Sequence, residues 1–280
     1  MRTIHARTIT DAVRAMCGPA AWRLPPGIRL ALAGALRREP DPRARRVLRC
    51  LLDNAASAAR NRLPVCQDTG VAFVMAELGQ GVRIAGGSLR DAVDRGVRRG
   101  YREAGLRASV QADPLRGGNT GDNTPAFLHL ELVPGDRLAL TLLPKGAGAE
   151  NMSALRMFPP SAGVREITGF VVETARLSWA NACPPLVAGI GIGSTFDGAP
   201  LLAKKALLRE YGRRHRDQFY ARLERKLLAA LNATGIGPAG LGGRTTALEA
   251  FVEAAPRHIA SLPVAVNLQC HAARRARRVL

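Results

Sequence analysis

The spacing of apolar residues divides the first part of the chain into helical and extended segments. Residues 1–62 carry apolar side chains three and four positions apart, which predicts a run of helices. Residues 71–78 form a short apolar stretch with β-branched side chains, which is typical of a buried strand. Residues 89–103 return to helical spacing. This part of the chain therefore predicts helices around a buried strand.

The rest of the chain mixes the two patterns. Residues 127–133 and 137–143 alternate apolar and polar side chains on either side of a Pro-Gly-Asp turn, which predicts a β-hairpin. Two helical segments and a last strand are predicted further on: residues 162–180, 199–232 and 262–268. The mixture predicts an α+β fold, with mixed sheets and flanking helices.

A glycine-rich run at residues 189–193 alternates glycine with isoleucine. It lacks the Lys-Ser/Thr ending of a P-loop and the glycine order of a dinucleotide fingerprint. A phosphate cradle at the start of the next helix is thus the weaker alternative. We interpret the run as a tight turn that allows another part of the backbone to approach closely.

The formal net charge of +19 comes almost entirely from arginine. Nucleic-acid binding is the first function that such a charge suggests. However, only 4% of the residues are aromatic, so stacking platforms for bases are scarce. We interpret the arginines as solvated helix faces and disfavour nucleic acid as a partner. A positive field would also attract a dianionic substrate or an acidic partner subunit.

Cellular location is constrained by three features. No run of about 18 apolar residues is present, so no membrane-spanning helix is predicted. Residues 1–7 lead into a mixed helix and not into an apolar signal core. The five cysteines are odd in number and widely spaced, unlike a disulfide framework. We expect a cytoplasmic protein.

The five cysteines fall into two groups. Cys17 and Cys50 lie in apolar helical patterns and are predicted to be small buried side chains. Cys66, Cys183 and Cys270 each stand at the end of a predicted element, in loops rich in Gly, Asn, Asp and Pro. Three thiolates from such positions can hold a metal or a cluster. Their wide gaps match no compact metal-binding motif, so spacing alone is weak support.

The sequence motifs that flank these cysteines are a more specific signal of function than the spacing of the cysteines. Several segments, in the same order, resemble the signatures of the class I (iron–sulfur) fumarate hydratase and L(+)-tartrate dehydratase family, α subunit: residues 63–70, 119–126, 145–153, 182–185 with 189–193 and 202–207, and 236–246 with 261–272. The resemblance covers residues 60–275. It implies one catalytic domain over residues 1–280 with the fold of the family's α subunit. Its parts would be a helical part at 1–62, a cluster-binding part at 63–272 and a basic tail at 273–280.

The resemblance also implies a cofactor. In this family a 4Fe-4S cluster is held by only three thiolates, which correspond here to Cys66, Cys183 and Cys270. One iron is left open. An open iron can bind a substrate hydroxyl and carboxylate and act as a Lewis acid, so that hydroxide becomes a tolerable leaving group.

Further residues match catalytic positions of the family. Gln67 and Asp68 would lie in the substrate pocket, with Asp68 as a proton-transfer group. His258 matches a histidine that contacts the substrate. Two structural alternatives stay open: Asp68 can simply brace the turn that follows it, and His258 can be a hydrogen-bonded structural histidine.

The substrate's carboxylates call for cationic partners. Arg107 is our candidate for a clamp, because a guanidinium meets a carboxylate through two parallel hydrogen bonds, and Arg116 competes for the role. Lys145 and Gly148 belong to the glycine-rich, substrate-side loop, although Lys145 can also merely begin a turn. Ala149 stands where the family has serine, and loss of that hydroxyl leaves the substrate's identity open.

These features together predict a hydro-lyase that reversibly adds or removes water on a small dicarboxylate. Fumarate to malate is the first choice and L(+)-tartrate the second. Single-chain relatives continue into another domain, whereas this chain ends soon after its last cysteine. We therefore expect a separate β subunit, in an α2β2 assembly. The rival hypothesis is a non-catalytic, basic nucleic-acid-binding protein on the same fold.

Overall fold

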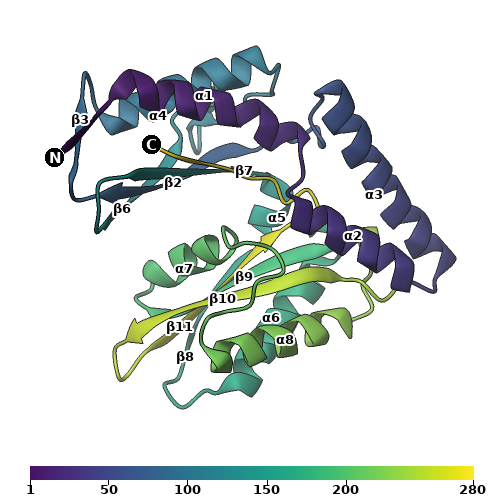
Figure 1. Cartoon of the computed structure of the whole chain (residues 1–280). Coiled ribbons are helices and arrows are strands. Elements are labelled where there is room, and N and C mark those ends of the chain that lie inside the picture. The colour runs from purple at the N-terminus through teal and green to yellow at the C-terminus, as the bar shows by residue number, and fades with distance from the viewer. The chain divides into compact units, whose positions relative to one another are not determined.

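The computed structural model describes all residues, 1–280, and the chain folds into two compact units. Unit 1 comprises Met1–Leu24, Asn54–Ala147 and Arg274–Leu280, and unit 2 comprises Pro25–Asp53 and Gly148–Ala273. Each unit contains both helices and a mixed sheet, which confirms the predicted α+β class (Figure 1). Helix α3 (Pro42–Asn61) begins in unit 2 and ends in unit 1.

Unit 1 is built on a four-stranded sheet in the order β12-β7-β2-β6. Its remaining strands form two small pairs, β1-β3 and β4-β5. The elements are β1 (Arg2–His5), α1 (Ala6–Trp22), β2 (Val71–Gly79), β3 (Val82–Ala85), α4 (Leu89–Glu103), β4 (Gln111–Asp113), β5 (Gly117–Asn119), β6 (Phe127–Val133), β7 (Leu138–Lys145) and β12 (Ala276–Val279). Helices α1 and α4 cover one face of the sheet (Figure 1), and Val13, Val97, Val74 and Leu140 belong to the same hydrophobic core.

The predicted hairpin of residues 127–143 is wrong, because β2 lies between β6 and β7. Strand β2 pairs in parallel with β6 and antiparallel with β7. The central place suits β2, since its residues 72–76 are buried on both faces. The turn after β6 crosses the end of β2, where Gln80 N donates to Val133 O at 2.9 Å and Gly81 N donates to Gly135 O at 2.8 Å.

Unit 2 contains a second mixed sheet, in the order β10-β9-β11-β8. Its elements are α2 (Pro26–Arg38), α5 (Ala147–Asn151), β8 (Ala154–Phe158), α6 (Val164–Ser178), a 3-10 helix (Trp179–Ala182), β9 (Leu186–Ser194), α7 (Gly198–Ala206), α8 (Gln218–Asn232), a second 3-10 helix (Pro238–Gly240), β10 (Ala247–Arg257) and β11 (Leu262–Gln269). Helices α6 and α8 pack on one face of the sheet and α7 on the other (Figure 1).

The glycine run 189–193 lies inside strand β9, so the predicted tight turn is wrong. The predicted close approach of another backbone is confirmed. A Cβ on Gly189 would lie 2.2 Å from Ala203 O, and one on Gly191 would lie 2.1 Å from Ala199 O. Both carbonyls belong to α7. The glycines therefore let a helix lie directly on the strand, and no phosphate cradle is formed at this point.

Two smaller predictions also need correction. The helix expected over 199–232 is interrupted between α7 and α8. Gly212 adopts a positive φ of 85° there, and the Asp217 carboxylate caps α8 by accepting from Phe219 N at 2.8 Å. Cys50 is exposed on α3 and not buried, whereas Cys17 is buried as predicted. Burial raises the pKa of the Cys17 thiol to about 12.

Candidate active site

The loop that carries Cys66 joins α3 to β2 in unit 1. Cys66 is half-buried, and its Sγ lies 3.3 Å from Gln67 Oε1. Asp68 Oδ1 accepts from Gly70 N at 2.9 Å, and its Oδ2 accepts from Ala147 N at 2.8 Å. Asp68 thus braces the turn, the structural alternative that the sequence left open. A carboxylate has about four acceptor positions, so bracing leaves it able to bind another donor.

Two buried side chains fix this loop by hydrogen bonds to the Gly70 carbonyl. Tyr101 Oη, from α4, donates to Gly70 O at 3.0 Å, and burial raises the pKa of Tyr101, which keeps it a donor. Asn123 Nδ2 donates to the same carbonyl at 3.2 Å, while its Oδ1 accepts from Ser109 N at 2.8 Å. Asn123 belongs to the signature 119–126, and its side chain helps to position the loop.

Replacing Asn123 with alanine should destabilise unit 1. The side chain is fully buried, and its loss leaves Ser109 N without its acceptor. We expect the free energy of unfolding, measured by urea denaturation, to fall by about 1–3 kcal/mol. Asn119→Ala is the control, because Asn119 is exposed in the same signature and water can replace its bonds. Equal losses in the two variants would contradict a special role for Asn123.

Arg274 is a third support that sequence reasoning missed. Its side chain is 1% exposed, and Nη2 donates to Asp68 O at 2.9 Å. Its Nε and Nη1 have no hydrogen-bond partner in the structure. Burying a guanidinium costs desolvation free energy. A buried arginine at this position therefore indicates a specific role in supporting the Cys66 loop. No signal in the arginine-rich C-terminal segment distinguished it from its neighbours.

The two candidates for a carboxylate clamp differ in their surroundings. Arg107 is exposed, its guanidinium has no ion pair, and its backbone O accepts from Thr69 Oγ1 at 2.8 Å. This bond places Arg107 beside the Cys66 loop. Arg116 instead donates Nε to Asp113 Oδ2 at 2.9 Å in the β4-β5 hairpin. Its hydrogen bonds hold the pKa of Asp113 at about 2. The geometry therefore favours Arg107.

Lys145 is the last residue of β7 and is 2% exposed. Its backbone is paired with Val71 of β2. A Cβ on Gly70 would lie 2.8 Å from Lys145 N, so the loop passes directly over this strand end. The glycine-rich loop and the Cys66 loop therefore meet at Lys145 within unit 1.

The other two candidate ligands lie together in unit 2. Cys183 follows the first 3-10 helix with φ 52° and ψ 65° and is exposed, and half-buried Cys270 directly follows β11. His271 joins the two loops, since its backbone N and its Nδ1 lie 3.3 Å and 3.1 Å from Cys183 O. Each cysteine thus stands at the end of an element, as predicted, and these two loops are neighbours.

A polar network connects three of the signature segments in unit 2. Asn267 Nδ2 donates to Glu150 Oε2 at 2.9 Å and to Ser153 Oγ at 3.0 Å. Glu150 also forms an ion pair with Lys204 of α7. Ser153 Oγ accepts from Leu268 N at 3.1 Å. The glycine-rich loop is thereby fixed to the strand that ends at Cys270.

Gly148 lies beside the Cys183 loop. A Cβ at this position would be 3.1 Å from Asn181 O, two residues before the cysteine. Its neighbour Ala149 is 3% exposed and packs in the hydrophobic core of unit 2. The serine that the family has at this position would therefore lie in this core, where its hydroxyl is shielded from solvent.

His258 lies at the opposite end of unit 2 from the two cysteines. It follows β10, and its Nδ1 accepts from Ala260 N at 3.1 Å within the turn to β11. Strand β11 separates this turn from Cys270, and its eight residues span roughly 25 Å. The bonds are those of a structural histidine. A substrate contact by His258 stays a prediction that this position does not support.

Neither unit by itself brings together three His, Cys, Asp or Glu side chains in a metal-binding arrangement. No helix has both the length and the apolar character needed to cross a bilayer. The chemistry of the loops therefore has to be judged from their donors: thiols at Cys66, Cys183 and Cys270, of which the last two are held on adjacent loops.

Comparison with known proteins identifies the family. The family model described as "Fumarate hydratase (Fumerase)" matches residues 10–279. The chain belongs to the fumarate hydratase family. It is 42% identical over 274 residues to a Methanocaldococcus jannaschii protein provisionally named L(+)-tartrate dehydratase subunit alpha, covering 96% of each chain. It is 30% identical over 271 residues to L(+)-tartrate dehydratase subunit alpha of Escherichia coli, covering 95% of this chain and 89% of that one.

Family membership confirms the predicted resemblance and the prediction of an enzyme of the hydro-lyase class. The family is one of iron–sulfur hydro-lyases, so membership implies an iron–sulfur cluster.

Proposed function

We propose that the chain is the α subunit of a hydro-lyase that reversibly adds or removes water on a small dicarboxylate. The 42% identity over nearly the whole length of a chain named as a tartrate dehydratase α subunit carries this proposal. That name favours L(+)-tartrate, and the family description favours fumarate and malate. We propose further that the protein works in the cytoplasm, where thiols stay reduced.

The cofactor we propose is a 4Fe-4S cluster held by Cys66, Cys183 and Cys270, with one iron open. The donors fit such a group: all three are thiols on loops at element ends, and none is fully buried. Cys66 lies on the loop between α3 and β2, and Cys183 and Cys270 lie on adjacent loops. When bound, the cluster supplies Lewis-acid chemistry for the departing or arriving hydroxide.

The chain's own residues would then orient the substrate and move its proton. Arg107 binds one carboxylate through two parallel hydrogen bonds. Asp68, held in one orientation by Gly70 N and Ala147 N, exchanges the proton on the carbon next to a carboxylate. Gln67, exposed beside Cys66, donates to a substrate oxygen. Gly148 leaves room for the substrate at the Cys183 loop.

We also propose a separate β subunit, in an α2β2 assembly, because the relatives are named as α subunits. The test is an anaerobic assay of the cluster-reconstituted chain, alone and mixed with the product of a neighbouring β-subunit-like gene. Fumarate, malate and L(+)-tartrate should each be supplied. Activity only in the mixture is expected. Full activity of the chain alone would contradict the need for a partner, and no activity on any of the three would contradict the substrate class.

The carboxylate clamp makes a separate prediction. Arg107→Met should lower kcat/KM by about ten- to a hundredfold, mainly through KM, because charge-assisted hydrogen bonds are worth about 1.5–3 kcal/mol. Arg116→Met is the matched control, since Arg116 is paired with Asp113 and should leave kcat/KM unchanged. The reverse order of effects would reassign the clamp to Arg116.

A further inference from the structure

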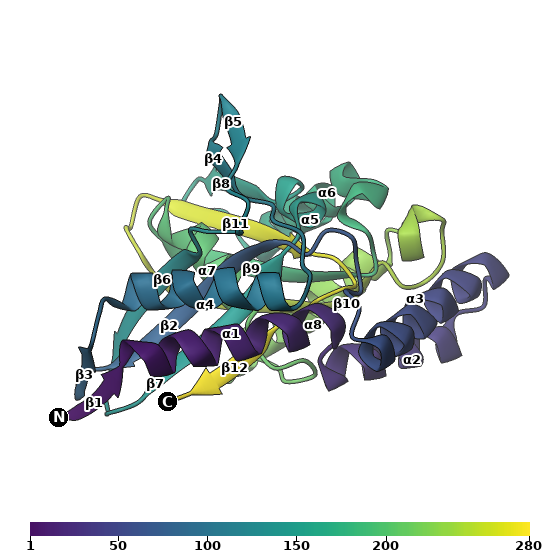
Figure 2. The ribbon, with the colours of Figure 1, turned by 90° about the horizontal axis from the view of Figure 1, so that it is seen from above.

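Arg274 places a positive charge in the interior of unit 1. Its side chain is 1% exposed, and its hydrogen bond joins Nη2 to Asp68 O at 2.9 Å. It forms no ion pair, and its Nε and Nη1 are buried without a partner. Figure 2 shows β12, the strand that follows Arg274 in the chain, beside β7 in the sheet of this unit. The guanidinium is therefore buried without a counter-ion in direct contact.

The bond to Asp68 O does not by itself explain an arginine. Asn123 holds the Gly70 carbonyl of the same loop with a neutral amide, which costs less desolvation free energy than a charge. A guanidinium adds a permanent charge, because it does not lose its proton in proteins. An unpaired charge in the interior is destabilising unless an anion compensates it. The position therefore indicates an anion that the chain does not supply.

The carboxylate of Asp68 is close to Arg274 but is bonded elsewhere. A Cβ on Gly146 would lie 3.0 Å from Asp68 Oδ2 and 3.8 Å from Arg274 Nη2, so both groups border the glycine-rich loop. The two carboxylate oxygens accept from Gly70 N and Ala147 N, and no ion pair with Arg274 forms. The acid of this loop thus leaves the guanidinium without a direct partner.

Two anions are expected at this site: the dicarboxylate substrate and the cluster. A substrate arrives from solvent and needs an exposed donor such as Arg107, whereas the unpartnered nitrogens of Arg274 are buried. A bound cluster is anionic, since three thiolates outweigh the charge of its iron–sulfur core. Charges attract each other through a low-dielectric interior without contact. The carbonyl that Arg274 holds lies two residues after Cys66, so the cluster suits this buried charge better than the substrate does.

We propose that Arg274 is the buried counter-charge of the cluster, and that its guanidinium stabilises the anionic cluster at Cys66. This inference rests on the proposed function, because it requires the cluster. Arg274 is a positioning residue and not a catalytic one, since its contact with the site is through the Asp68 carbonyl. A counter-charge stabilises only the loaded chain, whereas a purely structural bond stabilises the chain with and without the cluster. The two roles are therefore separable by experiment.

The first test compares Arg274→Gln with Arg274→Lys, since both side chains donate hydrogen bonds and only lysine is charged. Without the cluster, urea denaturation should find Arg274→Gln at least as stable as Arg274→Lys, because glutamine buries no unpaired charge. In the anaerobically reconstituted full-length chain this order should reverse. A chelator should remove iron from Arg274→Gln about tenfold or more faster than from the wild type. Arg274→Lys should stay within about threefold of the wild type, because a nearby anion favours the charged lysine.

The second test measures the effect of the charge on the cluster itself. Loss of a nearby positive charge favours the oxidised cluster, so Arg274→Gln should lower the reduction potential by about 59 mV, which is a tenfold change for one electron. Arg278→Gln is the matched control, because Arg278 is exposed in the same C-terminal segment and solvent screens its charge. The control should change neither the rate of iron release nor the potential.

Equal iron release and equal potentials in Arg274→Gln and Arg274→Lys would overturn this inference and leave the proposed cofactor standing. A chain without cluster in which Arg274→Gln is less stable than Arg274→Lys would also overturn it. Failure of both variants to fold would do the same, because the arginine would then serve the fold itself. A wild-type chain that binds no iron would overturn the proposed cofactor, and this inference with it.

Discussion

Cys183→Ser is expected to remove the iron–sulfur cluster and the activity together. Serine keeps the shape of the loop but is a poor ligand for the soft iron of a cluster. The reconstituted variant should lose its brown colour and most of its bound iron. Its kcat should fall by about a thousandfold or more, because Lewis-acid catalysis contributes several kcal/mol and each 1.4 kcal/mol is a factor of ten.

Cys50→Ser is the matched control for this experiment. Cys50 is exposed on α3 and lies outside every signature segment, so its replacement should change neither iron content nor rate. Cys66→Ser and Cys270→Ser should behave as Cys183→Ser does. Full iron content in any of these three variants would remove that cysteine from the proposed ligand set, even if activity were lost for another reason.

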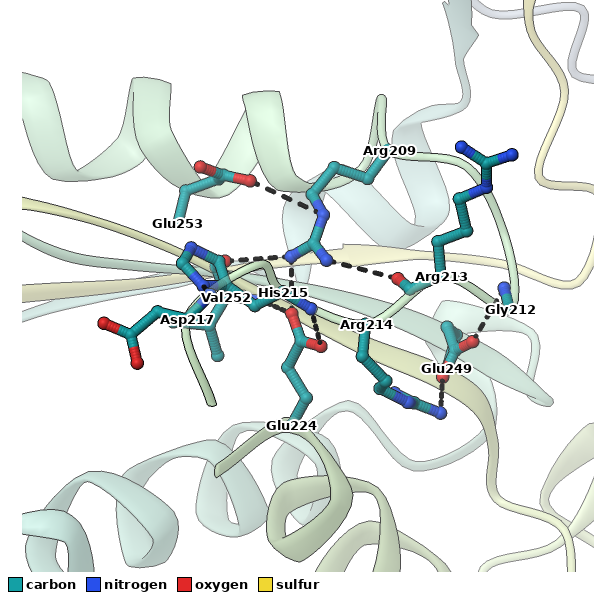
Figure 3. Close-up of polar contacts among 10 residues, drawn as sticks. All are labelled: Arg209, Gly212, Arg213, Arg214, His215, Asp217, Glu224, Glu249, Val252 and Glu253. Atoms are coloured by element: carbon teal, nitrogen blue, oxygen red, sulfur yellow. Dashed lines mark hydrogen bonds and ion pairs between the residues drawn. The ribbon is translucent and has the colours of Figure 1, made fainter. Parts of the chain in front are cut away.

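Glu224→Ala is expected to destabilise unit 2 strongly. Figure 3 shows the side chain of Glu224, from α8, in contact with Arg209 and His215 of the connection between α7 and α8. Its side chain is fully buried and forms an ion pair with Arg209, while Oε2 accepts from His215 N at 2.9 Å and Oε1 accepts from Val252 N at 3.0 Å. Removing the carboxylate leaves a largely buried guanidinium and two backbone donors without these bonds. Breaking such a pair costs about 3–5 kcal/mol.

Urea denaturation of the full chain measures this loss. Glu210→Ala is the control, because Glu210 and its partner Arg213 are both exposed, and such a pair is worth about 1 kcal/mol or less. Arg209 keeps Glu253 within 3.6 Å in the Glu224→Ala variant, which sets the lower end of the expected range. Similar losses in the two variants would show that the buried pair contributes no more than a surface one.

The sequence predicted individual helices and strands better than it predicted which of them lie side by side. The strand ends that carry the cysteines and most of the helices follow from short-range spacing and lie where they were predicted, whereas the helix expected over 199–232 is interrupted. Alternation in residues 127–143 correctly predicted two strands, but alternation says nothing of which strand lies beside which. The pairing was decided by β2, which is distant in the chain and apolar on both faces. The glycine run was misassigned for the same reason, since its contact is with a later helix.

The same distinction applies to the candidate site. The three candidate cysteine ligands lie in distinctive sequence motifs, so the resemblance to the family was enough to identify them. Tyr101, Asn123 and Arg274 support the Cys66 loop from three separate parts of the chain. A tyrosine in an amphipathic helix and an arginine in a basic segment look ordinary in the sequence. Their role arises only from burial next to particular backbone carbonyls, which requires the folded structure.

The bonds of Asn267 and Ser153 have a consequence for how this enzyme can diverge. Because the glycine-rich loop and the strand leading to Cys270 share these bonds, substitutions in one segment are epistatic with those in the other. Substitution of Glu150 or Ser153 during a change of substrate requires compensating changes in the strand that leads to Cys270. We therefore expect substitutions to accumulate at loop positions that make no bond in this network.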